Sequence, residues 1–183
     1  MPAYSLMGEP IASTARAAVA KARGRAATAA GAAGAAQVSL DLSSIGPLLA
    51  EGRRAARELV ASVAPDILFA TEAEVEGFLG RHAAEGILEH ASIAVIKLGS
   101  RGARVIARDG DGEALQFDVA TPRVAAADTT GAGDAFSAGF IAGWLTARSA
   151  GHTVPDALHR ATMTGHRTAA RQLTTSKQEL PPG

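Results

Sequence analysis

The pattern of apolar positions along the chain predicts alternating strands and helices. Short apolar runs predict strands at 38–42, 67–69 and 93–96, and the last run is of the uninterrupted kind typical of a strand covered on both faces. Helices are predicted where apolar residues recur three and four apart, or where alanine, the best helix former, dominates. These segments are 12–36, 52–63, 71–79, 132–147 and 153–171.

Two alternating runs near the middle of the chain, 104–108 and 114–119, predict a β-hairpin. Asp109-Gly110-Asp111-Gly112 between them is a strong turn signal. Strands that alternate with helices indicate an α/β protein with a largely parallel sheet. Neither an internal repeat nor a linker rich in proline and serine divides the 183 residues, so we predict one domain, 1–183.

The charge balance and the cysteine content limit which partners and metal sites are expected. Eighteen basic and eighteen acidic side chains cancel, which argues against binding to nucleic acid or to an anionic membrane surface. The absence of cysteine excludes disulfides and cysteine-ligated metals. We find neither a secretory signal nor an apolar run of about 18 residues. We therefore predict a cytoplasmic protein with no membrane span.

The segment Thr129-Thr130-Gly131-Ala132-Gly133-Asp134 is the strongest candidate for chemistry. The apolar spacing after it predicts a helix that begins at about Gly131 or Ala132, so the N–H groups of Gly131, Ala132 and Gly133 would be unpaired donors at the positive end of the helix dipole. Such donors bind phosphate or stabilise developing negative charge. Asp134, in the first helical turn, is either a general base or only a favourable charge for the dipole.

The nine residues Asp128-Thr-Thr-Gly-Ala-Gly-Asp-Ala-Phe136 closely resemble the C-terminal signature of the ribokinase-like (PfkB) family of carbohydrate kinases. This resemblance implies a three-layer α/β/α fold with a mostly parallel sheet. It also implies that the amides of Gly131, Ala132 and Gly133 hold the transferring phosphoryl group, that Thr130 lies at the ATP site, and that Asp134 is the catalytic base. Asp128 corresponds to an aspartate that often helps to bind a monovalent cation such as K⁺.

Two further segments carry the same resemblance. Asp66-Ile-Leu-Phe69 and the residues after it resemble the strand that leads to the family's Asn-x-x-Glu motif, and Glu74 falls on the glutamate that helps to organise Mg²⁺ and phosphate. Thr71 replaces the asparagine, and Thr71 with Glu74 is equally a capping box, a reading that can coexist with the first. Lys97-Leu-Gly99-Ser-Arg-Gly102-Ala resembles the strand-end loop beside the nucleotide, which assigns Lys97, Gly99 and Gly102 to ATP binding.

The resemblance covers the family's C-terminal half. Asp41-Leu-Ser-Ser44 resembles the strand end that precedes this half, and Tyr4 to Pro10 resembles the middle of the family's sequence. Nothing matches the Gly-Gly motif, the sugar-binding aspartate or the lid of the N-terminal half. Without those sheet neighbours an edge and an apolar flank would be exposed, so we predict self-association or a partner that supplies the missing half.

The resemblance implies an ATP-dependent carbohydrate kinase that uses Mg²⁺. The alternative is a catalytically inactive nucleotide-binding or interaction module, derived from such a kinase by loss of the sugar-binding half. The acceptor stays open among ribose, fructose, a keto-deoxy acid and a nucleoside, because family specificity resides mostly in the half that does not match.

Other polar and aromatic side chains are interpreted as structural. Phe136, Phe140 and Trp144 recur four apart and predict core positions on one helix face. His159 and His166 lie seven apart on another helix but lack the closer clustering that a metal site needs. Arg53, Arg54 and Arg57 could touch phosphate but are better explained as a solvated face.

Overall fold

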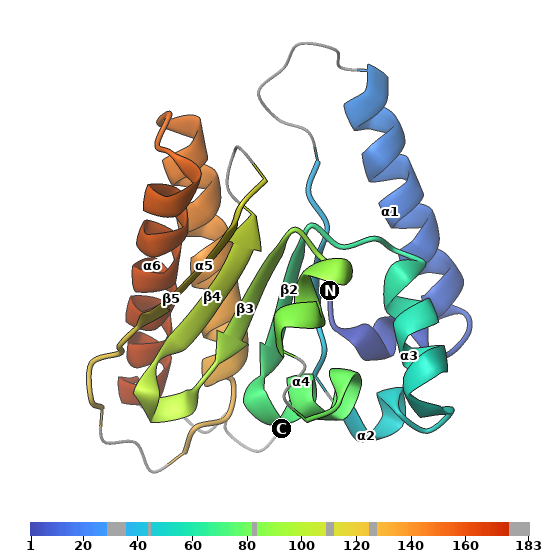
Figure 1. Cartoon of the computed structure of the whole chain (residues 1–183), viewed down its shortest axis with the longest axis horizontal. Coiled ribbons are helices and arrows are strands. Elements are labelled where there is room, and N and C mark those ends of the chain that lie inside the picture. The colour runs from blue at the N-terminus through green and yellow to red at the C-terminus, as the bar shows by residue number, and fades with distance from the viewer. Residues whose placement is uncertain (29–35, 44, 82–83, 109–111, 125–127, 176–183) are drawn as a thin grey trace, which may run out of the picture. The chain divides into compact units, whose positions relative to one another are not determined.

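The predicted strands form one five-stranded sheet in the order β1-β2-β3-β4-β5 in the computed structural model of the chain (Figure 1). The structure describes residues 1–28, 36–43, 45–81, 84–108, 112–124 and 128–175. The strands are β1 (Ser39–Asp41), β2 (Ile67–Thr71), β3 (Ile93–Lys97), β4 (Ala103–Arg108) and β5 (Ala114–Val119). The predicted turn at Asp109–Asp111 lies outside the described residues.

The chain divides into two compact units. The first comprises Met1–Gly99 with Ala103–Asp118, and the second comprises Ser100–Gly102 with Val119–Gly183. The single-domain assignment stays a prediction.

Parallel pairing in the first unit aligns the carboxyl ends of three strands. Leu40 of β1 pairs with Leu68 of β2, and Phe69 of β2 pairs with Val95 of β3, both in parallel register. Strand β4 then runs antiparallel to β3. The mostly parallel α/β sheet is as predicted, and its carboxyl edge is the place where open α/β sheets bind ligands.

Helices of the first unit connect and flank these strands. They are η1 (Ala3–Leu6), α1 (Ile11–Thr28), α2 (Ile45–Leu48), α3 (Gly52–Ala61), α4 (Glu72–Leu79) and η2 (Ala84–Glu89), while η3 (Gly99–Arg101) begins at the last residue of Met1–Gly99 and continues into the second unit. The sequence pattern predicts α1, α3 and α4, whereas the short elements η1, α2, η2 and η3 were not predicted because fewer than two helical turns carry no readable period. The part of the predicted helix beyond Thr28 lies outside the described residues.

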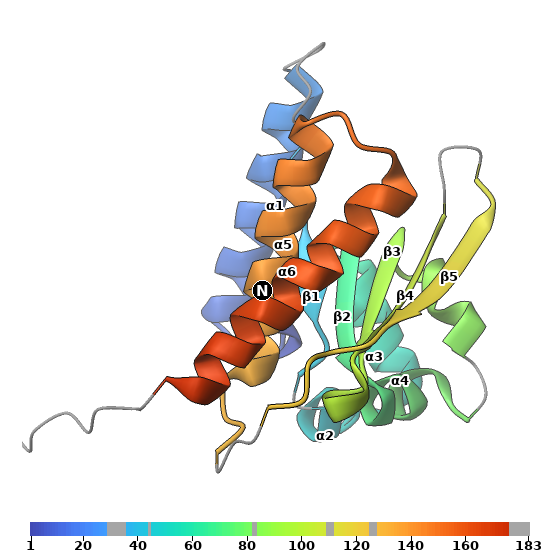
Figure 2. The same cartoon turned by 90° about the vertical axis from the view of Figure 1, so that its left-hand side faces the viewer.

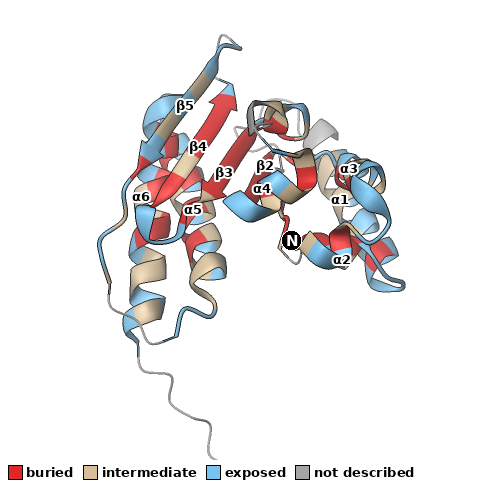
Figure 3. Ribbon diagram, turned by 60° about the horizontal axis from the view of Figure 1, so that its bottom comes forward, coloured by how far each residue is buried: buried red, intermediate tan, exposed pale blue. Residues whose placement is uncertain are grey.

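The apolar runs of the central strands become the core of the first unit. Strands β2 and β3 are buried along almost their whole length, as Figure 3 shows in red. Leu40, Val60, Phe78 and Ile87 are fully buried in the same cluster. Burial on both faces explains why β3 reads as a continuous apolar run rather than as an alternation.

Helix α4 is fixed at both ends by neighbouring residues. Thr71 caps its start, and the guanidinium groups of Arg53 and Arg57 donate to the carbonyls of Gly77 and Leu79 in its last turn, at 2.8 Å and 3.1 Å. Cations at a helix C-terminus complement the dipole and satisfy carbonyls without helical partners. The predicted solvated face is therefore right for Arg54, which is exposed and pairs with Glu58, and wrong for half-buried Arg57.

The second unit contains a helical hairpin. Helices α5 (Ala132–Ser149) and α6 (Val154–Thr174) run side by side (Figure 2). Close approach depends on small residues, since a methyl group at Gly139 would lie 2.4 Å from Thr168 Oγ1 and one at Gly143 would lie 2.9 Å from the Cα of Ala161. Phe136, Phe140 and Trp144 are buried on α5, which confirms the predicted core face. Among the described residues, no helix has the length and hydropathy of a membrane span.

Candidate functional site

The segment Asp128–Asp134, which we call the phosphate turn, leads directly into helix α5. Asp128 shapes it: its Oδ1 accepts a hydrogen bond from the Thr130 N–H at 2.8 Å. An aspartate that bonds the amide two residues on is a common way to build a tight turn. Gly131 follows as the N-cap of α5, so the predicted helix start is confirmed.

The amide groups of the phosphate turn differ from the prediction in one respect. The Ala132 N–H donates to the Thr129 carbonyl at 3.1 Å, so it is not an unpaired donor. Within the described part of the chain, the N–H groups of Gly131 and Gly133 have no such partner. Because the turn uses the Ala132 N–H for its own hydrogen bond to Thr129, two of the three predicted amide donors remain available at the positive end of the α5 dipole.

Gly131 is required by its backbone conformation. Its φ of +81° lies in the left-handed region, where a side chain is strained. A methyl group at this position would also lie 3.4 Å from Nε2 of Gln172. Gln172 near the end of α6 therefore lies against the phosphate turn. The sequence carries no signal for this neighbour, because it depends on how α6 folds back along α5.

Asp134 is an exposed side chain in the first turn of α5. It follows Gly131, the N-cap of the helix, by three residues. An exposed carboxylate beside two amide donors can accept a proton from a hydroxyl while the amides stabilise negative charge. A negative charge in the first turn of a helix also favours the helix dipole. Both roles of Asp134, as general base and as a favourable charge, stay predictions.

His166 fastens α6 to the chain that leads toward the phosphate turn. Its Nε2 donates to the carbonyl of Val119 at 3.0 Å, and its ring packs on Phe136 at 5.1 Å between centroids. Burial lowers the pKa of His166, and the bond to the Val119 carbonyl raises it by a smaller amount. The imidazole thus serves as a buried hydrogen-bond donor to the Val119 carbonyl. Among the described residues, no cluster of three His, Asp or Glu side chains could hold a metal.

The two glycines predicted at the ATP site have different surroundings. A methyl group at Gly102 (φ +108°) would lie 2.0 Å from the Val119 carbonyl oxygen, so this glycine is needed for close packing of two backbone segments. Gly99 (φ +62°) has open space where a side chain would be. Packing alone therefore explains Gly102, while Gly99 leaves its backbone accessible to a ligand.

A second group of polar side chains, which we call the strand-end cluster, lies at the carboxyl edge of the first unit's sheet. It comprises Asp41, Thr71, Glu74 and Lys97, from the ends of β1, β2 and β3 and the start of α4. Lys97 Nζ donates to Asp41 Oδ2 at 2.7 Å, with side chains 15% and 13% exposed. The sequence suggested each of these residues separately, but only the sheet brings Asp41 and Lys97 together.

Thr71 and Glu74 form the predicted capping box. The Thr71 N–H donates to Glu74 Oε2 at 2.7 Å, and the Glu74 N–H donates to Thr71 Oγ1 at 3.3 Å. One carboxylate oxygen is therefore committed to the backbone. Mg²⁺ is commonly held by one or two carboxylates together with substrate phosphates and water. The remaining oxygen of Glu74 fits such a limited role, which stays a prediction, as does cation binding by Asp128.

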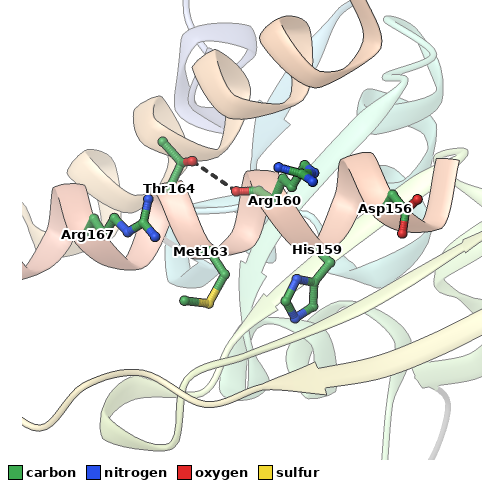
Figure 4. A pocket seen from close by; sticks show the side chains of 6 residues that line it. All are labelled: Asp156, His159, Arg160, Met163, Thr164 and Arg167. Carbon is green, nitrogen blue, oxygen red and sulfur yellow. Dashed lines mark hydrogen bonds between the residues drawn. The ribbon is translucent and has the colours of Figure 1, made fainter. Parts of the chain in front are cut away.

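One face of α6 carries a shallow pocket of about 370 Å³ (Figure 4). Its lining comes from a single helical stripe, and Thr164 Oγ1 donates to the Arg160 carbonyl at 2.9 Å within it. The stripe comprises Asp156, His159, Arg160, Met163, Thr164 and Arg167. None of these residues was predicted as functional, and long exposed side chains on one helix account for the pocket.

Comparison with known proteins identifies the family to which these features belong. Residues 11–180 match the model of the pfkB family of carbohydrate kinases. The ATP-dependent ribose-1-phosphate kinase of Halopiger xanaduensis is 40% identical over 113 residues, which cover 61% of this chain and 35% of that protein.

Solved structures share the fold. Fructokinase from Vibrio cholerae, bound to fructose, ADP and a calcium ion, matches with a TM-score of 0.69 and 24% identity over 96% of this chain and 54% of its own. Aminoimidazole riboside kinase from Salmonella enterica, with aminoimidazole riboside and an ATP analogue, matches with a TM-score of 0.72 and 24% identity, over 96% and 56%. The chain thus spans about half the length of these structures, and the predicted ribokinase-like fold is confirmed. With a family match over nearly its whole length, the chain belongs to the pfkB family of carbohydrate kinases.

Proposed function

We propose that this chain carries the phosphoryl-transfer turn of an ATP-dependent kinase that phosphorylates a sugar hydroxyl. The observation that carries the proposal is the geometry of the phosphate turn. Gly131 in the left-handed conformation starts helix α5 with two unpaired amides, and Asp134 follows within one helical turn. Family membership supplies the class of reaction, because pfkB proteins are carbohydrate kinases.

In the proposed reaction, the Asp134 carboxylate accepts the proton of the acceptor hydroxyl. The hydroxyl oxygen forms a bond to the γ-phosphorus of ATP, the bond from that phosphorus to the β-phosphate oxygen breaks, and ADP leaves. The amides of Gly131 and Gly133 stabilise the charge on the transferring group. A bound Mg²⁺ would neutralise phosphate charge, and the free oxygen of Glu74 suits it. Positioning and electrostatics provide most of the rate in such reactions.

Calorimetric titration with ATP, with and without Mg²⁺, is the first test of this proposal. We expect saturable binding that Mg²⁺ strengthens. ADP release should then be screened with acceptors suggested by the relatives and the family: ribose 1-phosphate, fructose, ribose, aminoimidazole riboside and a keto-deoxy acid. Absence of nucleotide binding under both conditions would contradict the proposal.

Replacing Asp134 tests its role as the base. Asp134→Asn should lower turnover by about a thousandfold, the usual range for loss of a general base, while ATP binding changes little. Asp156→Asn is a matched control, because Asp156 is likewise an exposed carboxylate in the first turn of a helix. Turnover by Asp134→Asn at the rate of the control would exclude the role.

The second candidate is a catalytically inactive nucleotide-binding or interaction module. The chain spans about half the length of each solved relative, so catalysis by this chain is itself a proposal. Saturable ATP binding without ADP release from any acceptor would support this candidate over the first. Self-association stays a prediction, and sedimentation of the purified chain over a range of concentrations tests it.

A further inference from the structure

The pairing of Asp41 with Lys97 spans the end of a strand that lies between them. In the sheet register, Asp41 is level with Phe69 of β2, and Lys97 is level with Thr71, two residues farther along β2. The lysine side chain therefore crosses the end of β2 to reach the carboxylate at 2.7 Å. Its ammonium group is thus placed at the carboxyl edge of three parallel strands, where α/β sheets bind ligands.

The two partners are anchored to different extents. Asp41 is short, and its Oδ1 accepts a hydrogen bond from the Ser43 N–H at 3.1 Å, which fixes the carboxylate to the backbone. Lys97 carries its charge on a flexible four-carbon stem with three rotatable donors. Any rearrangement of the pair would therefore move the ammonium group and leave the carboxylate in place.

Burial distinguishes this pair from the surface ion pairs of the same unit. The side chains of Lys97 and Asp41 are 15% and 13% exposed, whereas those of Arg54 and Glu58 are 93% and 65% exposed. A buried ion pair is weak evidence for stability, since desolvation offsets much of the attraction. A pair of this kind at a ligand-binding edge is better explained by a binding role.

The residues that follow Lys97 leave room for a ligand. Gly99 is exposed, has a φ of +62°, and would place a methyl group in open space. An anionic group beside this loop would offer Lys97 an alternative to Asp41. Phosphate oxygens carry more charge than one carboxylate and accept several charge-assisted hydrogen bonds.

We propose that Asp41 is a positioning residue that holds Lys97 in the unliganded chain and releases its ammonium group to a phosphate of the bound nucleotide. This inference rests on the proposed function, because it requires that the chain binds a nucleotide. Asp41 competes with the phosphate for the same cation, so it lowers affinity and keeps Lys97 oriented until the ligand arrives.

The proposed transfer of Lys97 from Asp41 to a nucleotide phosphate is tested by the affinity for ADP, measured by calorimetry at low salt. Asp41→Asn preserves the shape and the acceptor for Ser43 and should bind ADP about fivefold more tightly, because Lys97 no longer has a competing carboxylate. Lys97→Met should bind about tenfold more weakly. The double variant should match Lys97→Met, since the proposed competition with phosphate requires the lysine. Asp118→Asn, which removes the same charge from the exposed pair with Arg104, should leave affinity unchanged.

Two results overturn the inference: unchanged or weaker ADP binding by Asp41→Asn, or tighter binding that persists in the double variant. Either result, with ADP binding by the unaltered chain, leaves the proposed function standing. Absence of ADP binding by the unaltered chain removes both.

A measurement on the unaltered chain covers the case in which Asp41→Asn does not fold. The sequence has three lysines, Lys21, Lys97 and Lys177, so ¹³C labelling at lysine Cε gives three NMR signals, and Lys97→Arg assigns one of them. Saturating ADP should shift the Lys97 signal and leave the Lys21 signal in place. A Lys97 signal that does not respond to ADP overturns the inference.

Discussion

The phosphate turn and the strand-end cluster hold their functional groups in different ways. The phosphate turn works through backbone amides of small, partly exposed consecutive residues at the start of one helix. The strand-end cluster works through side chains from separate strands, and its central ion pair is mostly buried. A group formed by consecutive residues can be recognised in a sequence, whereas one formed by residues 56 positions apart becomes visible only in the fold.

The strongest test of this contrast is to strain the backbone of the phosphate turn. Gly131→Ala places a side chain at φ +81°, which costs about 1–2 kcal/mol, and brings a methyl group to the Gln172 amide. If the amides must keep this geometry, ATP affinity should fall about tenfold or more, in addition to the loss of stability. Calorimetry and urea unfolding measure the two effects.

Gly151→Ala is the matched control for that variant. Gly151 has a φ of +80° and open space around it, so the same substitution costs similar backbone strain away from the phosphate turn. Its stability should fall by about the same 1–2 kcal/mol while ATP affinity is retained. Equal affinities in the two variants would mean that the phosphate turn does not depend on its left-handed glycine.

Local sequence patterns predicted the parts of the site that local physics determines. The helix start at Gly131, the capping box of Thr71 and the core face with Phe136 each depend on residues within a few positions, and each was confirmed. The bond of Ala132 to Thr129 was missed, because a glycine motif does not specify which amides the turn itself consumes.

Contacts between distant segments account for what the sequence could not predict. Arg57 pairs with carbonyls at the end of α4, and Gly102 is required by the approach of the backbone at Val119. Asp41 and Lys97 come together because their strands, β1 and β3, flank β2 in the sheet, so the two side chains can meet across the end of β2. In each case, a residue's role is determined by a neighbour more than ten positions away, which no periodicity records.

Replacing His166 tests whether the stability of the second unit depends on its buried hydrogen bond to the Val119 carbonyl. His166→Phe leaves the Val119 carbonyl without its donor and should lower the free energy of unfolding by about 1–2 kcal/mol at pH 8. Urea unfolding at several pH values measures this loss and its pH dependence.

The pH dependence has a defined sign. Because burial lowers the pKa of His166, the unfolded chain takes up the proton first as pH falls. Stability should therefore decrease below about pH 6.5, the ordinary value, until the folded form is protonated as well. His90, whose pKa burial and then Arg57 also lower, contributes in the same direction and remains in the variant. The slope should become shallower in His166→Phe, and an unchanged slope would contradict this assignment.

The smallest expected effects come from variants that distinguish the two predicted roles of Glu74, which are capping of α4 and organisation of Mg²⁺. Thr71→Ala removes the side-chain acceptor at the start of α4 and should lower the free energy of unfolding by about 1 kcal/mol. Thr153→Ala removes the corresponding cap of α6 and should have a similar effect.

Glu74→Gln keeps an oxygen that can accept from the Thr71 N–H but removes the charge. If Glu74 helps to organise Mg²⁺, this variant should retain stability and lose the Mg²⁺ dependence of ATP binding, which calorimetry measures. Mg²⁺ dependence that survives in Glu74→Gln would reduce Glu74 to a helix cap, and the functional part of the strand-end cluster would then be the Asp41–Lys97 pair alone.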